Sequence, residues 1–159
     1  MIRDAVRGAI AGAAATWCMD RITTAMYEVQ APEVTKQEQA AQPNGRSSVS
    51  NLIDRVEAEI GFVIPAERRP LVEQAIHYGL GVAPGAMYGV IRRYVPFARV
   101  GRGLAYGLVL FVVNDEYLNT KLGLAGPPGA YPIESHFRGV VGHAVLGVTT
   151  ETGIQLLGG

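Results

Sequence analysis

Residues 108–119 read LVLFVVNDEYLN, an apolar run that changes abruptly into polar residues. Leu108 to Val113 are all apolar, and Asn114, Asp115 and Glu116 follow directly. Uncharged runs of about 10–14 residues are more typical of buried core helices than of membrane spans, which take about 20 residues. The stretch therefore predicts a helix whose polar end lies either in solvent or in a polar layer shared with other helices.

Three other stretches of low charge accompany it, so helices are expected at about 5–27, 73–94, 102–119 and 134–157. A polar connector, 28–72, separates the first two, and its centre (34–50) has the composition of a loop. After a helix start at Asn51, a helical repeat puts Leu52, Ile53, Val56 and Ile60 on one face, which predicts a short amphipathic helix. At 159 residues, the chain (1–159) is expected to form a single domain.

The composition narrows the possible partners. Charged residues make up 18% of the chain, below the roughly 25% of ordinary soluble domains. Basic and acidic residues number 14 each, so there is no overall basic field to attract nucleic acid, which we exclude as a partner. Cys18 is the one cysteine, which excludes an intrachain disulfide and a multi-cysteine metal site.

Small residues recur four positions apart in the expected helices. In a soluble helix glycine costs about 1 kcal/mol relative to alanine, whereas in lipid it allows helix backbones to approach closely. This spacing favours an all-α, four-helix transmembrane bundle, a single membrane domain. Only the run Ala75–Ile91 approaches spanning length, so a soluble α domain stays the alternative. The predicted helix-packing residues are Gly8, Gly12, Gly81, Gly85, Gly89, Gly103, Gly107 and Gly139.

Polar residues converge when the four helices are laid antiparallel. One side of the bundle then contains the C-terminal ends of the first and third helices and the N-terminal ends of the second and fourth. Ionisable residues in a spanning segment usually face the bundle interior or a water-filled cavity. The expected polar layer is either a packing device or a site for protons or small ions, and it contains Asp20, His77, Asn114, Asp115, Glu116 and His143.

Metal binding has weak candidates in His77, His143 and Asp115. His136 and His143 are seven residues apart and share a helical face, and imidazole with carboxylate suits several divalent ions. However, the chain contains no HExxH or comparable ligand spacing, and no nucleophile elbow or phosphate loop. The sequence therefore assigns no metal site, no catalytic residue and no cofactor.

The basic residues suggest an orientation. Arg92, Arg93, Arg99 and Arg102 fall within eleven residues, and Arg3 and Arg7 belong to the same side of the expected bundle. Cytoplasmic segments of membrane proteins carry an excess of Lys and Arg, so both termini are expected in the cytoplasm.

Four segments carry a family resemblance: AGAAATWCMDR (11–21), HYGLGVAPGAMYG (77–89), GLVLFVVNDEYLNTKLGL (107–124) and HFRGVVGHAVLGVTTE (136–151). Together they resemble the YagU-like family of bacterial inner-membrane proteins, whose domain has no assigned function. The resemblance implies a small multi-spanning protein with a proposed connection to acid tolerance. It supplies no catalytic residue to carry over.

The expected function is that of a non-enzymatic bacterial inner-membrane protein linked to acid or envelope stress, in which the polar layer responds to protons or small ions. Two alternatives remain: a metal- or cofactor-binding membrane enzyme built on the same cluster, and a structural subunit of a larger membrane assembly. The expected partners are the lipid bilayer and a second copy of the chain or another membrane protein.

Overall fold

The computed structural model describes all 159 residues, and the chain is helical without any strand. Short 3₁₀ turns at Pro43–Gly45, Pro96–Arg99 and Pro128–Ala130 connect the longer elements. The other elements are α1 (Ile2–Glu28), α2 (Pro32–Ala41), α3 (Ser48–Ile60), α4 (Arg69–Ile91), α5 (Leu104–Leu110), a π-helix (Phe111–Leu118), the single turn α6 (Asn119–Lys121) and α7 (Ile133–Leu156).

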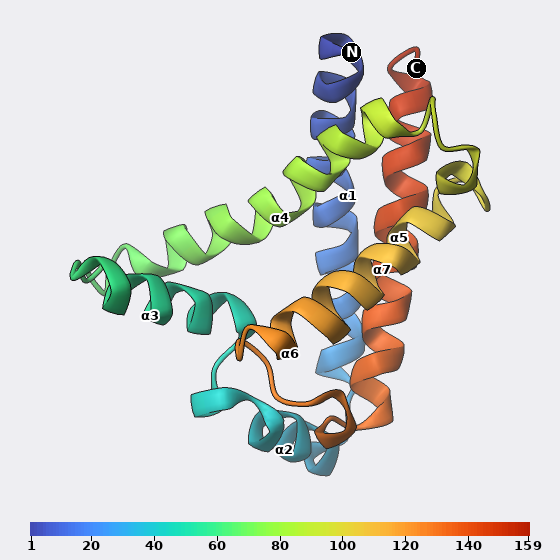
Figure 1. Cartoon of the computed structure of the whole chain (residues 1–159). Coiled ribbons are helices and arrows are strands. Elements are labelled where there is room, and N and C mark those ends of the chain that lie inside the picture. The colour runs from blue at the N-terminus through green and yellow to red at the C-terminus, as the bar shows by residue number, and fades with distance from the viewer.

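Helices α1 and α7 form the central pair of the fold. They run side by side in opposite directions, so that the two termini lie at the same end of the molecule (Figure 1). Helix α4 crosses α1, and α5 with the π-helix crosses α7. Helices α2 and α3 lie toward the other end, beside the turn that leads into α7.

Glycines allow the backbones to touch at these crossings. A Cβ atom on Gly8 of α1 would lie 2.1 Å from the carbonyl oxygen of Gly85 in α4. Between α5 and α7, a Cβ on Gly107 would lie 2.0 Å from the carbonyl oxygen of His143. The other glycines singled out in the sequence also meet neighbouring elements: Gly12 meets Gly81, Gly81 meets Thr16, Gly89 meets Asp4, Gly103 meets Gly147 and Gly139 meets Phe111.

The predicted transmembrane bundle is wrong. None of the helices combines the length and the continuous apolar sequence that a bilayer crossing requires. Helices α1, α4 and α7 have 27, 23 and 24 residues, but polar or charged residues such as Asp20, His77 and Glu151 interrupt their apolar faces. The stretch expected as one helix over 102–119 is divided into a seven-residue α-helix and a π-helix. The glycine spacing therefore corresponds to close helix contacts here.

The connector is more ordered than its composition suggests. Its centre, expected as a loop, contains α2, which begins with Pro32 at its first turn. The amphipathic helix is present as α3, but it starts three residues before the expected start at Asn51. Its N-cap is Ser47, whose hydroxyl accepts a hydrogen bond from the backbone N–H of Ser50.

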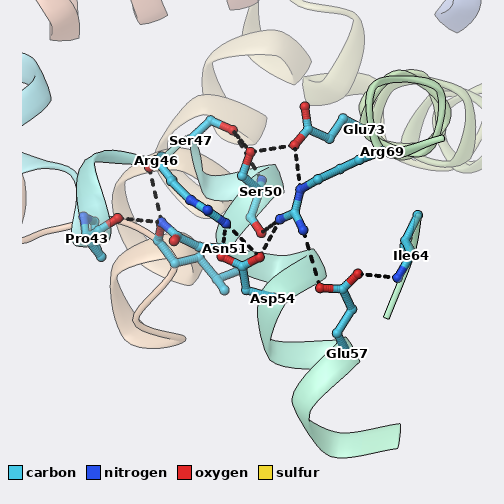
Figure 2. A network of polar contacts seen from close by, with 11 residues as sticks. Pro43, Arg46, Ser47, Ser50, Asn51, Asp54, Glu57, Ile64, Arg69 and Glu73 are labelled. Atoms are coloured by element: carbon cyan, nitrogen blue, oxygen red, sulfur yellow. Dashed lines mark hydrogen bonds and ion pairs between the residues drawn. The ribbon is translucent and has the colours of Figure 1, made fainter. Parts of the chain in front are cut away.

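An ion-pair cluster joins α3 to the start of α4 (Figure 2). The guanidinium of Arg69 donates to the carbonyl oxygen of Ser50 at 3.1 Å and to Oε2 of Glu57 at 3.3 Å, and it also pairs with Asp54. Asp54 also accepts two hydrogen bonds from Nη1 of Arg46, one at each carboxylate oxygen. These hydrogen bonds hold the pKa of Asp54 below its ordinary value, and the bond from Arg69 has the largest effect. The cluster fixes where α4 begins, two turns before His77.

Candidate functional site

A cavity of about 530 Å³ lies among the helices, and every α-helix except α5 contributes to its lining. Met19, Leu80, Phe111 and Leu146 supply apolar surface. The remaining lining is rich in polar side chains from α4, the π-helix and α7, together with the turn over residues 122–131. The cavity brings together residues far apart in the chain, including five of the six residues of the expected polar layer.

The first polar contact in this region joins α1 to α4. Nε2 of His77 lies 2.7 Å from Oδ1 of Asp20. His77 lines the cavity, whereas Asp20 does not. Asp20 and His77 are thus a directly bonded pair, and Asp20 is the member of the expected layer that lies outside the cavity lining.

The π-helix explains how three successive polar residues share one cavity. In an α-helix, neighbouring side chains diverge by about 100°, so three in a row would spread around the helix. Here the backbone N–H of Asn119 bonds to the carbonyl oxygen of Asn114, five residues earlier, which widens the turn. Asn114, Asp115 and Glu116 all line the cavity as a result. Such π-turns occur frequently at functional sites.

Asp115 approaches His143 of α7. Nδ1 of His143 lies 3.1 Å from the carbonyl oxygen of Gly139 and 3.7 Å from Oδ2 of Asp115. Because a carbonyl oxygen only accepts, Nδ1 carries a proton, which also faces the carboxylate. Asn114 donates to the other oxygen of Asp115 at 2.9 Å. Burial raises the pKa of Asp115, while the His143 ring and the Asn114 amide oppose this rise.

Glu116 bonds to a histidine that the sequence analysis did not include in the polar layer. Nδ1 of His136 lies 2.7 Å from Oε1 of Glu116, and Nε2 lies 3.0 Å from the carbonyl oxygen of Pro128. Both ring nitrogens therefore face oxygen acceptors, and an imidazolium can donate to both. The available signal was the position of His136, two helical turns before His143 on the same face.

A contact between α2 and α7 lines another part of the cavity. The guanidinium of Arg138 pairs with Glu38 and donates to Oε1 of Gln30 at 2.5 Å. Glu38 and Arg138 both line the cavity. Sequence reasoning did not find this pair, because α2 was expected to be a loop. The hydroxyl of Ser135 is buried in the same lining without a hydrogen-bond partner, so the cavity has a free polar atom for a small polar guest.

The three weak metal candidates are divided between two pairs. His77 bonds to Asp20, whereas His143 faces Asp115. No group of three or more His, Cys, Asp or Glu side chains is arranged to hold a metal ion. The geometry instead gives three separate histidine–carboxylate pairs, with closest N–O distances of 2.7, 2.7 and 3.7 Å.

No family model, curated protein or solved structure matches the chain. The resemblance to the YagU-like family stays a prediction that rests on its four sequence segments.

Proposed function

We propose that the protein is a non-enzymatic, proton-responsive protein that serves acid or envelope stress in a bacterium. One observation carries this proposal: the chain has three histidines, and each of them pairs with a carboxylate at one cavity. Histidine is the side chain whose charge ordinarily changes between about pH 5 and 8. A set of three such groups around one space is therefore suited to convert acidity into a local change of charge.

The pairs link α1 to α4 and the π-helix to α7. Protonation of a ring beside an ionised carboxylate converts that contact into an ion pair. Each ion pair draws together two different helices. Acidification thus changes both the charge inside the cavity and the strength of the contacts across it.

The test combines a titration with a survival assay. In the unmodified protein, NMR signals of the three imidazole rings are followed from pH 8 to pH 4. The variants Asp20→Asn, Asp115→Asn and Glu116→Gln each remove the charge of one carboxylate. We expect each substitution to displace the titration midpoint of its own histidine partner and to lower survival of an acid challenge in a strain that depends on the protein.

The matched control is Glu59→Gln, which makes the same change at an exposed carboxylate that pairs with Arg55 outside the cavity. It should leave all three midpoints and survival unchanged. If Asp20→Asn, Asp115→Asn and Glu116→Gln all survive acid as well as the unmodified strain does, the proposed function is wrong, even where their histidine titrations have moved.

Attachment to the inner membrane is a separate part of the proposal. Val6, Ile10 and Trp17 of α1 are exposed, and such apolar side chains support contact with a lipid surface or another chain. Fractionation of the same cells checks the location, since the protein should sediment with inner membranes. Light scattering of the purified protein checks the expected homo-oligomer.

A further inference from the structure

A second pocket, of about 440 Å³, lies where the chain passes from α4 to α5 beside the C-terminal end of α7. This is the end of the molecule that also carries both termini (Figure 1). The polar side chains that line it are Arg92, Arg93, Arg99, Arg102, Glu151 and Gln155. Four guanidinium groups thus surround one pocket with a single carboxylate among its lining residues.

That carboxylate is already engaged. Glu151 is 1% exposed, and its two oxygens accept bonds from Arg92 at 2.8 and 2.5 Å and from the hydroxyl of Tyr88 at 2.6 Å. Gln155 donates a further bond at 2.8 Å. Burial alone would raise the pKa of Glu151, but these hydrogen bonds lower it, so the group is ionised at neutral pH. Its single charge balances Arg92.

The other arginines keep unused donors. Arg99 reaches Glu151 only at 3.5 Å, and Arg102 makes no ion pair. Arg92 uses Nε and Nη2 for Glu151, so its Nη1 donates no hydrogen bond to the protein. Arg93 bonds to Asp4 at 2.7 Å. The C-terminal ends of α4 and α7 add only about half a negative charge each. The pocket therefore retains an excess of positive charge.

The backbone holds Arg102 at the pocket in an unfavourable conformation. Gly101, Arg102 and Gly103 have φ angles of 64°, 56° and 89°, which side-chain-bearing residues rarely adopt. Gly103 is packed tightly on α7, since a Cβ atom there would lie 2.3 Å from the carbonyl oxygen of Gly147 and 2.8 Å from Cβ of Glu151. Backbone strain of this kind often occurs at binding sites.

We infer that this arginine pocket binds a phosphate group, either of a free phosphate ion or of the head group of an anionic phospholipid. The planar guanidinium offers paired N–H donors that match phosphate oxygens, and the guanidinium groups of Arg99 and Arg102 make no hydrogen bond to the protein here. Arg99 and Arg102 supply the open charges, while the Arg92–Glu151 pair holds the base of the pocket in place. The inference goes beyond the proposed proton response and does not depend on the histidine pairs.

The test uses the full chain and two probes. Calorimetric titration with inorganic phosphate measures binding of the free ion. Sedimentation with phosphatidylglycerol vesicles, compared with phosphatidylcholine vesicles, measures binding of an anionic head group. The variant Arg99→Gln/Arg102→Gln removes the two open charges. Its matched control is Arg21→Gln/Arg68→Gln, which removes two charges from exposed arginines outside the pocket.

We expect at least one probe to bind and the Arg99→Gln/Arg102→Gln variant to bind it more weakly, on the order of tenfold or more, with little change in the control. Binding of phosphate alone assigns the free ion, and binding of phosphatidylglycerol vesicles alone assigns the head group. In the unmodified protein, the Nε–H NMR signals of Arg99 and Arg102 should shift with the bound probe, a measurement that does not depend on the variant folding. The inference is overturned if neither probe binds or if both variants lose affinity equally.

Discussion

At the scale of single residues, Asp115 and Asp54 are two carboxyls with opposite behaviour. Burial in the cavity raises the pKa of Asp115, whereas hydrogen bonds from Arg69 and Arg46 lower the pKa of Asp54. The folded chain thus binds the proton of Asp115 more tightly than the unfolded chain does, and that of Asp54 less tightly. Ionisation of Asp115 therefore destabilises the folded chain, and ionisation of Asp54 stabilises it.

Substitution of each carboxyl by an amide tests these signs. Asp115→Asn should raise the unfolding temperature at pH 7, and the gain should disappear as the pH falls below the ordinary value of 3.8, where the carboxyl is protonated in both states. Asp54→Asn, the control, should lower the unfolding temperature at pH 7, with a loss that fades as the pH falls through the lowered pKa. Thermal unfolding followed by circular dichroism measures both. A lower unfolding temperature for Asp115→Asn at pH 7 would contradict the assigned cost of burial.

At the scale of elements, the π-helix determines which side chains reach the cavity. Deletion of the exposed Val113 removes one residue from the widened turn and should convert Phe111–Leu118 to an α-helix. Asp115 and Glu116 would then rotate by about 100° relative to α5, away from His143 and His136. We expect helix content to be retained while the titrations of these two histidines change together. Val113→Ala, which keeps the chain length, should leave them unchanged, and a similar change in both variants would refute the role of the π-helix.

At the scale of the whole molecule, Glu151 joins the ends of α4 and α7 through Arg92 and Tyr88. Glu151→Ala leaves Arg92, 5% exposed, as a buried cation without its partner, and should lower the free energy of unfolding by about 3–5 kcal/mol at pH 7. Urea denaturation measures this loss of stability. The control Glu134→Ala, at an exposed position near the start of α7, should lower the free energy of unfolding by less than about 1 kcal/mol. Equal losses for the two variants would exclude the buried pair as the source of stability.

The stabilisation by Glu151 also depends on pH. Because the pKa of Glu151 is lowered in the folded chain, this stabilisation is fully present above pH 4.5, the ordinary pKa, and is lost as the pH falls through the lowered pKa.

Local patterns in the sequence were enough for the helical class, for the approximate extent of α1, α4 and α7, and for the glycines that meet at helix crossings. These features depend on near neighbours along the chain, since apolar and small residues recur with the period of a helix. The same patterns led to the wrong conclusion of a transmembrane bundle, because close helix contact has the same glycine spacing whether or not lipid surrounds it.

The tertiary structure alone decided the partners of the polar residues. Asp20 and His77 are 57 positions apart, and Glu38 meets Arg138 across 100 positions, so no local pattern could pair them. The π-helix lies within LVLFVVNDEYLN, yet nothing in that stretch distinguishes it from an ordinary helix by composition. Its i→i+5 bonds turn Asn114, Asp115 and Glu116 toward one cavity, and the surrounding helices supply the histidines. The sequence by itself determined where the polar residues lie along the helices. Distances between separate helices determined which carboxylate each histidine meets.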